Sequence, residues 1–275
     1  MSYRPLPLIL RYAVLVVGML FILVPMYVTI TVALKTPAES AQNFFSLPSR
    51  LYLGNFEEVI REKRFFTYLT NSVYITCVSV LLMLIVIPMA AFAISRNYHK
   101  RHYRLLYALI LSSIFVPFQT IMLPIFRHLF NLHLLNQHGL ILMHLTLALS
   151  EGVFLCVGFL KNIPLELDEA AKIDGCGIGQ LFVRIIYPLM RPIIVTLLIL
   201  NALWVWNDFL LPLVVLNRHP DYWTLPLFIY NFKSEYSFDY NLAFAGFFIT
   251  MLPIILLYGF LQRHIIAGLT EGAFK

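Results

Sequence analysis

The segment "LDEAAKIDGCGIGQLFVRIIYPLMRP", residues 167–192, interrupts a chain that is otherwise dominated by apolar stretches. Its charged residues and glycines predict a helix that ends at Gly175, since glycine tolerates the left-handed conformation that closes many helices. A second short helix, about 178–186, is expected to stop before Pro188, and the next apolar helix to follow it. Residues 161–188, which hold most of this segment, are called the charged island below.

The composition indicates that lipid surrounds much of the chain. Of its 275 residues, 60% are hydrophobic and only 12% are charged, and the mean hydropathy is +0.80. A soluble domain cannot hide that much apolar surface, because a large part of it must face water. The net charge of +6 comes from basic residues that lie between apolar segments and form no extended basic face, so it does not indicate nucleic acid binding.

Stretches long enough to cross a bilayer occur six times. About 20 apolar residues in a helix span the hydrocarbon core. We therefore expect an all-α polytopic membrane protein, with a single transmembrane domain over residues 1–275. The expected spans are 9–34, 68–94, 105–130, 139–160, 190–216 and 241–263.

Prolines interrupt most of these spans. Each proline removes a backbone donor, and in a membrane bundle the freed carbonyl can be satisfied by a neighbouring helix or a water-lined cavity. We therefore expect kinked or broken helices, as in proteins that open and close a path. The prolines concerned are Pro25, Pro88, Pro117, Pro124, Pro212 and Pro253.

The basic residues predict the orientation. The loop 95–104 has no acidic residue and should face the cytoplasm, whereas the loop 35–67 dilutes its basic residues with glutamates and should face outward. Both termini and the charged island are then cytoplasmic. The basic residues of the cytoplasmic loop are Arg96, Lys100, Arg101 and Arg104.

On physical grounds alone the charged island has two interpretations. Two short helices with a small-residue face, at Ala170 and Ala171, could dock against a partner protein, with acidic residues offering charge pairs. The island could equally be an amphipathic loop that rests on lipid headgroups, which is the more ordinary arrangement.

The spacing of the charged island resembles the EAA signature of ABC-importer permeases, which is EAA, three residues, G, nine residues, I, one residue, L and P. The matching residues are Glu169, Ala170, Ala171, Gly175, Ile185 and Pro188. Tyr187 stands where leucine is usual, a change that we interpret as mild because both side chains are large and apolar.

Other stretches extend this resemblance over nearly the whole chain. "EAAKIDG" is similar to the variant found in carbohydrate importers of the maltose-permease type. Ser150-Glu151 departs from the proline and apolar residue that are common in that group. The further matching stretches are "NSVYIT", "VPFQTIMLPIF", "LLNQHGLIL", "WVWNDFLLPL" and "GLTEGAFK".

The resemblance implies a role for the island and a set of partners. The island would be the coupling helix of a type I importer permease in a bacterial inner membrane, seated in a cleft of an ATP-hydrolysing subunit. Partners would be a second, different permease chain, two ATP-binding subunits and an extracytoplasmic solute-binding protein. ATP and Mg²⁺ would be used by the ATPase, because this chain has no phosphate-binding loop and is expected to bind no cofactor. The expected contact and hinge residues are Glu169, Ala170, Ala171, Asp174, Gly175, Ile185 and Pro188.

Polar residues inside the expected spans are candidates for the substrate pathway. Asn201, Trp204 and Asp208 have the spacing i, i+3 and i+7, which predicts one helix face, and Asn207 lies beside them. Glu151 lies within another span. Ionisable residues in a membrane usually face protein or water. Trp204 could stack on a sugar while the polar groups bind its hydroxyls, or the same groups could join helices to each other.

The expected outer loop 217–240 is rich in aromatic residues and could contact the binding protein or its ligand. Candidates are Tyr222, Trp223, Tyr230 and Tyr236. No metal site is expected. The histidines at 128, 133, 138 and 144 have no acid or thiol nearby in the sequence and are interpreted as polar residues at the membrane interface, and the three cysteines as reduced packing residues.

Two rival functions remain open at this stage. A secondary transporter driven by an ion gradient would need clusters of ionisable residues and paired broken helices, for which only Glu151 and Asp208 are available. A membrane scaffold or sensor would leave the EAA spacing to coincidence.

Overall fold

The computed structural model describes residues 8–62, 64–235 and 239–273, and these form helices and turns without a strand. They divide into two compact units. The first holds the described residues up to Phe66 together with Phe228–Pro253, and the second holds Thr67–Leu227 and the described residues from Ile254 onward.

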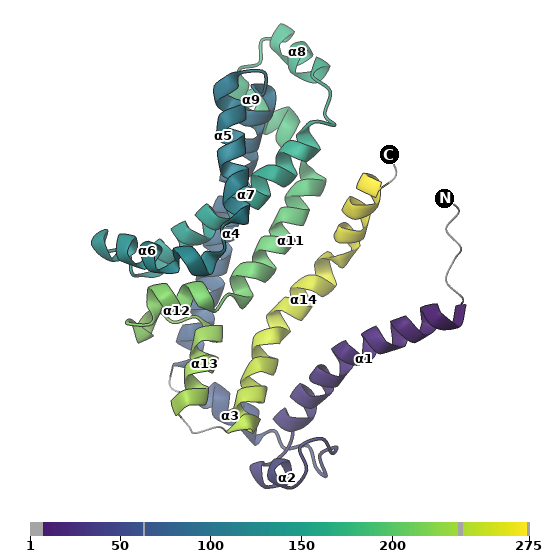
Figure 1. The fold of residues 1–275 in the computed structure, drawn as a ribbon, viewed down its shortest axis with the longest axis vertical. Coiled ribbons are helices and arrows are strands. Elements are labelled where there is room, and N and C mark those ends of the chain that lie inside the picture. Colours follow the sequence, from purple (N-terminus) through teal and green to yellow (C-terminus); the bar gives the residue numbers. More distant parts are fainter. Residues whose placement is uncertain (1–7, 63, 236–238, 274–275) are drawn as a thin grey trace. The chain divides into compact units, whose positions relative to one another are not determined.

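The first unit is organised around the end of α1 (Leu8–Ala33). Short helices follow it, α2 (Pro37–Gln42) and α3 (Gly54–Arg61), and the unit also takes in most of α13 (Leu225–Glu235) and the start of α14 (Tyr240–Ala273). Figure 1 shows these elements in sequence colours.

Two buried asparagines donate hydrogen bonds to carbonyls at the end of α1, where the last carbonyls have no partner within the helix. The Asn55 side chain from α3 donates to the carbonyls of Ala33 and Lys35, each at 2.8 Å. The Asn241 side chain from α14 donates to the carbonyls of Val32 at 2.8 Å and Lys35 at 2.9 Å. These amides join α1, α3 and α14 at one point of the first unit.

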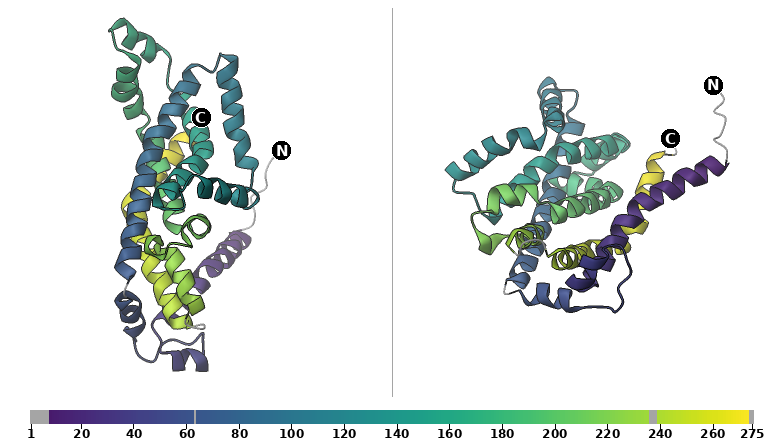
Figure 2. Two further views of the ribbon diagram at one scale, coloured as in Figure 1. Left: turned by 90° about the vertical axis from the view of Figure 1, so that its left-hand side faces the viewer. Right: turned by 60° about the horizontal axis from the view of Figure 1, so that its bottom comes forward.

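The second unit contains long helices and, at one end, the charged island. Figures 1 and 2 show α8 and α9 of the island at that end, near the end of α4. The elements are α4 (Phe65–Arg96), α5 (Arg101–Ser112), η1 (Ser113–Phe115), α6 (Phe118–Asn131), α7 (Gln137–Leu160), α8 (Glu166–Ile173), α9 (Ile178–Leu181), η2 (Phe182–Ile186), α10 (Tyr187–Leu189), α11 (Arg191–Asn207), α12 (Leu210–Leu216) and η3 (Pro220–Tyr222).

Helix α4 approaches α7 closely at Gly152 within the second unit. A side-chain carbon placed on Gly152 of α7 would come within 2.7 Å of Cδ1 of Ile87 in α4, so glycine permits this approach. Ile87, Val153 and Leu197, from α4, α7 and α11, are almost fully buried in one apolar cluster. Such a cluster fixes the relative positions of the helices that carry the polar residues.

Helices long and apolar enough to cross a membrane are Leu8–Ala33, Phe65–Arg96 and Gln137–Leu160 among the described residues. They match the expected spans 9–34, 68–94 and 139–160. The expected span 241–263 lies within α14, in which Tyr240–Leu256 is an apolar stretch. If each bent helix pair is counted as one span, the described residues contain up to 5 candidate membrane spans.

The expected spans 105–130 and 190–216 are not continuous helices. Arg101–Phe115 and Phe118–Asn131 meet at 108°, because Val116 precedes a proline and is extended, with ψ 109°. Helix α11 ends at Asn207, since Asp208 is extended with ψ 129°, and α12 starts again at Leu210. Prolines do not act alike, because Pro25, Pro88, Pro124 and Pro253 lie inside continuous helices.

Candidate functional site

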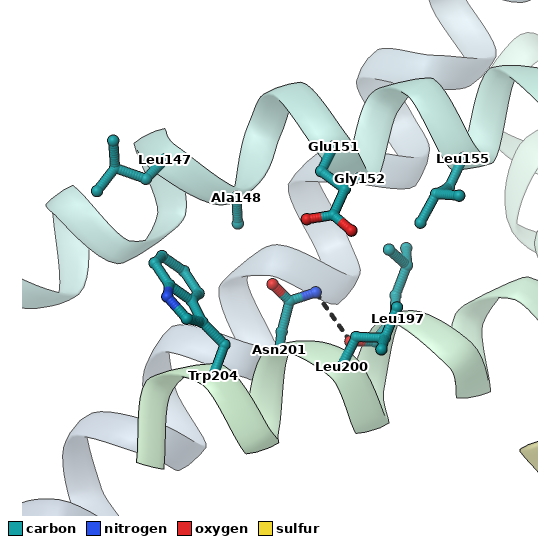
Figure 3. A pocket seen from close by; sticks show the side chains of 9 residues that line it. All are labelled: Leu147, Ala148, Glu151, Gly152, Leu155, Leu197, Leu200, Asn201 and Trp204. Carbon is teal, nitrogen blue, oxygen red and sulfur yellow. Dashed lines mark hydrogen bonds between the residues drawn. The ribbon is translucent and has the colours of Figure 1, made fainter. Parts of the chain in front are cut away.

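A small cavity separates α7 from α11, with a volume of about 120 Å³. Figure 3 shows Glu151 of α7 and Asn201 of α11 pointing toward each other across it, with Trp204 near Leu147 and Ala148. The Asn201 amide donates to the carbonyl of Leu197 at 2.8 Å, which orients the side chain. The cavity thus combines a carboxylate, an amide and an indole, the side chains that bind and stack on sugars.

Glu151 also lines a larger cavity of about 880 Å³ on a neighbouring face of α7. The bend between α5 and α6 forms its far wall, through residues such as Ser113 and Ile125. The hydroxyls of Ser113 and Ser150 are hydrogen-bonded to each other. The departure Ser150-Glu151 therefore has local consequences: Ser150 ties α7 to the bend, and Glu151 borders both cavities.

Asp208 does not share a helix face with Asn201 and Trp204, contrary to the sequence interpretation. It follows the end of α11, and its carboxylate accepts from the backbone N–H of Leu211 at 3.4 Å. Its other oxygen lies 3.0 Å from Nε2 of His144 in α7. Helical spacing does not extend to Asp208 because the helix stops one residue before it.

His144 is fully buried, so its interpretation as an interfacial residue was wrong. Its ring meets the ring of Trp204 edge to face, with centroids 5.3 Å apart. The pair His144–Asp208 thus joins α7 to the break after α11 and contacts a residue that lines the small cavity. Asn207 does not take part, because its amide is exposed and donates to the carbonyl of Leu203 in its own helix at 2.8 Å.

The first helix of the charged island ends as the sequence predicted. Gly175 has φ +79°, the N–H of Gly175 bonds to the carbonyl of Lys172 at 3.1 Å, and the N–H of Cys176 bonds to that of Ala171 at 2.9 Å. These bonds form a Schellman motif, which satisfies the last carbonyls of α8.

The EAA residues divide between a buried base and an exposed face. Ala171 is buried, while Glu169, Ala170, Asp174 and Gly175 are exposed. Large apolar side chains are exposed beside them, Ile173 at 86%, Ile178 at 73% and Val183 at 65%. This apolar set was not predicted from the sequence, although isoleucines within a charged loop were a readable signal of exposed apolar surface.

A buried ion pair fixes the base of α8. Nη2 of Arg96, the last residue of α4, donates to Oδ1 of Asp168 at 2.9 Å, and Nε lies 2.8 Å from Oδ2. Nη1 of the same guanidinium contacts the carbonyls of Leu160 and Ile163, each at 3.4 Å. One side chain therefore connects α4, the end of α7 and the island.

The second helix of the island does not stop before Pro188, which corrects the sequence prediction. A proline clashes with the carbonyl four residues before it in an α-helix. Here the π-helical turn η2 precedes Pro188, the N–H of Tyr187 bonds to the carbonyl of Phe182, and the helix runs on to Leu189. Ile185 and Pro188 thus lie in this irregular stretch, which meets α11 at an angle of 75°.

The candidate aromatic residues of the loop 217–240 fall in different settings. Trp223 donates from Nε1 to the carbonyl of Leu216 at 3.1 Å, and its own carbonyl accepts from Asn71 at 3.0 Å, so it helps to hold the loop. Tyr222 and Tyr230 are exposed. Tyr236 lies outside the described residues.

Helices that are apolar over spanning lengths, together with a charged helical island at one end, define a polytopic membrane protein. The family described as "Binding-protein-dependent transport system inner membrane component" matches residues 86–271. The chain belongs to this family.

Curated relatives match along nearly the whole chain. The multiple sugar-binding transport system permease protein MsmG of Streptococcus mutans is 41% identical over 267 residues, which covers 96% of each chain. The probable starch degradation products transport system permease protein AmyC of Thermoanaerobacterium thermosulfurigenes is 37% identical over 251 residues, 91% of each. The chain is therefore similar throughout to permease subunits of sugar transport systems.

Solved structures show the same fold. The crystal structure of a bacterial ABC transporter involved in the import of the acidic polysaccharide alginate contains a chain with a TM-score of 0.80 and 22% identity, over 93% of this chain and 95% of that one. The alginate transporter in complex with its pentasaccharide-bound periplasmic protein gives a TM-score of 0.71 at 16% identity, over 92% and 93%.

Proposed function

We propose that the chain is the permease subunit of an ATP-driven ABC importer that carries a carbohydrate, such as a sugar, oligosaccharide or polyol, across a bacterial inner membrane. The names of the relatives, which refer to sugars and starch products, support a carbohydrate. The family supports dependence on a solute-binding protein. The chain would supply half of the translocation pathway as one domain of six spans, with both termini in the cytoplasm.

The observation that carries this proposal is the construction of the charged island. Its base is anchored through Arg96 and Asp168, while Glu169, Ala170 and Ile173 remain exposed. A firmly held element with an exposed apolar and acidic face suits a surface that receives force from a partner. We propose that an ATP-binding subunit binds this face. It would be one of two such subunits, which would hold ATP and Mg²⁺.

The cavity between α7 and α11 is the proposed contact site for the sugar. The Glu151 carboxylate and the Asn201 amide would bind hydroxyl groups, and Trp204 would stack on an apolar sugar face. His144 and Asp208 would hold Trp204 in place from behind. A second, different permease chain would complete the pathway, and an extracytoplasmic binding protein would deliver the sugar near the loop that contains Tyr222.

Reconstitution tests the proposal directly. The chain is combined in liposomes with the partner permease, ATPase and binding protein encoded beside it, and a sugar panel is first screened by thermal shift of the binding protein. We expect uptake of the sugars that bind, and uptake that depends on internal ATP. Uptake that persists without ATP and stops with a protonophore would instead indicate a secondary transporter.

Gly175→Pro tests the role of the charged island. Proline cannot adopt the positive φ of Gly175 and has no N–H for the carbonyl of Lys172, so the end of α8 should be lost. We expect normal insertion but no stimulation of ATP hydrolysis by sugar and binding protein. Gly158→Ala in α7, where the added carbon meets nothing within 4 Å, is the control. Normal stimulation in Gly175→Pro would contradict the coupling role.

A further inference from the structure

Helix α4 contains a buried proline where the helix needs a donor. Pro88 has no N–H, so the carbonyl of Leu84, four residues earlier, loses its usual partner inside the helix. A backbone carbonyl that is left without a partner away from water is costly. Helices that cross membranes tolerate proline when a neighbouring group satisfies this carbonyl.

The charged island supplies the missing donor. The hydroxyl of Tyr187 donates to the carbonyl of Leu84 at 3.2 Å. Tyr187 directly follows the π-helical turn of the island, 103 residues from Leu84 in the sequence. Leucine, the usual residue at this motif position, has no hydrogen-bond donor, so the change to Tyr187 has a specific physical consequence.

A second contact links the same two segments beyond the proline. The ring of Phe92, four residues after Pro88, lies against the ring of Phe182 in η2, with centroids 5.3 Å apart. The rings of Phe182 and Tyr187 are in turn 5.7 Å apart. The irregular half of the island therefore contacts α4 on both sides of Pro88.

The residue before the proline faces α7. Ile87 is fully buried, and its side chain occupies the space that Gly152 leaves free. Gly152 follows Glu151, and both line the small cavity. A bend of α4 at Pro88 would therefore move the atoms that pack directly behind the cavity wall.

We propose that Tyr187 is a positioning residue that completes the hydrogen bonding of α4 at Pro88 from outside the helix. Movement of η2 and α10, the half of the island that Arg96 does not hold, then lets α4 bend at Pro88, because withdrawal of the hydroxyl frees the carbonyl of Leu84 at a proline that favours a kink. The side chain of Ile87 then shifts against Gly152, which lines the cavity. This inference rests on the proposed function, since it describes how the island and the sugar site are coupled.

A double-mutant cycle tests the inference in the reconstituted importer. Pro88→Ala gives α4 its own N–H for the carbonyl of Leu84, so the hydroxyl of Tyr187 becomes redundant. We expect Tyr187→Phe to lower the ratio of sugar-stimulated to basal ATP hydrolysis about fivefold, the effect of one ordinary hydrogen bond on an equilibrium. In the Pro88→Ala background the same change should have less than about a twofold effect.

Two further variants sharpen the cycle. Tyr187→Leu should behave as Tyr187→Phe, because neither side chain can donate. Tyr74→Phe removes a hydroxyl from an exposed position of α4 and should leave the ratio unchanged. Should Pro88→Ala abolish stimulation by itself, the same four variants are compared by the thermal unfolding of the purified complex.

Two results would overturn the inference. One is an equal loss on Tyr187→Phe in both backgrounds, in either measurement. The other is a stimulation ratio in Tyr187→Phe that matches that of Tyr74→Phe. Failure of the proposed function is distinguishable, because the unmodified complex would then show no sugar-stimulated ATP hydrolysis before any variant is compared.

Discussion

Two side-chain pairs in the second unit each place an aspartate beside a helix terminus, but the two aspartates are bound differently. Asp168, at the start of α8, meets the planar guanidinium of Arg96, which also contacts two backbone carbonyls. Asp208, after α11, meets a single nitrogen of His144 and the N–H of Leu211. The first arrangement holds a surface element rigidly, because arginine stays charged and presents several donors in a fixed geometry. The second has fewer bonds and joins α7 to the break after α11.

The largest effect is expected from Arg96→Ala. It leaves the carboxylate of Asp168 buried without its partner and frees two carbonyls, and breaking a buried ion pair on one side costs about 3–5 kcal/mol. We expect a large fall in the thermal stability of the purified complex, or failure of the chain to assemble.

Arg61→Ala is the matched control, since Arg61 pairs with Glu57 on an exposed helix surface. Its cost should be below about 1 kcal/mol. Similar losses in the two variants would show that the pair at Asp168 does not hold the island.

A smaller effect is expected at the second pair. His144→Ala removes one hydrogen bond to a partly buried carboxylate, which corresponds to about 2 kcal/mol. The ring of Trp204 also loses its edge-to-face contact. With Trp206 and Trp223 replaced by phenylalanine in the purified subunit, the fluorescence of Trp204, which is already 38% exposed, should change because the indole loses this contact.

His138→Ala, in the first turn of the same helix and exposed, provides the control and should leave the spectrum unchanged. A variant at His144 with an unaltered spectrum and stability would mean that the pair does not position Trp204.

The smallest effect is expected at an exposed acid in the first unit. The hydroxyl and then the N–H of Ser49 hold the pKa of Glu39 below its ordinary value of 4.5, with further help from Thr36. This contribution to stability is present above the unfolded-state pKa and is lost as the pH falls through the lower pKa of the folded state.

Ser49→Ala should raise the pKa of Glu39 and move the onset of acid unfolding to higher pH, and Glu39→Gln should remove this part of the pH dependence. Thermal unfolding measured over a pH series checks both. An acid profile of Ser49→Ala that overlays that of the unmodified chain would contradict the assignment.

The sequence predicts features that depend on local chemistry. The end of α8 at Gly175 follows from the conformational freedom of one residue, and the long apolar helices follow from composition. The EAA spacing identifies the family because its residues lie close together in the chain.

Contacts between distant residues were not predictable in the same way. Arg96 and Asp168 are 72 residues apart, and His144 and Asp208 are 64 apart, so packing decides that they meet. The face assigned to Asp208 assumed a helix that in fact ends at Asn207. Tyr187 was judged by its size, although the carbonyl freed by Pro88 was a readable reason to consider its hydroxyl.

The exposed apolar side chains of Ile173, Ile178 and Val183 affect how long the subunit survives in the cell before assembly. In the proposed importer, a copy inserted before its ATPase is available would present these side chains to water, where exposed apolar surface promotes aggregation and capture by chaperones and proteases. Docking of the ATPase would cover them. The amount of surviving subunit would then follow the supply of its partner, so that the cell removes unassembled copies without a separate sensor.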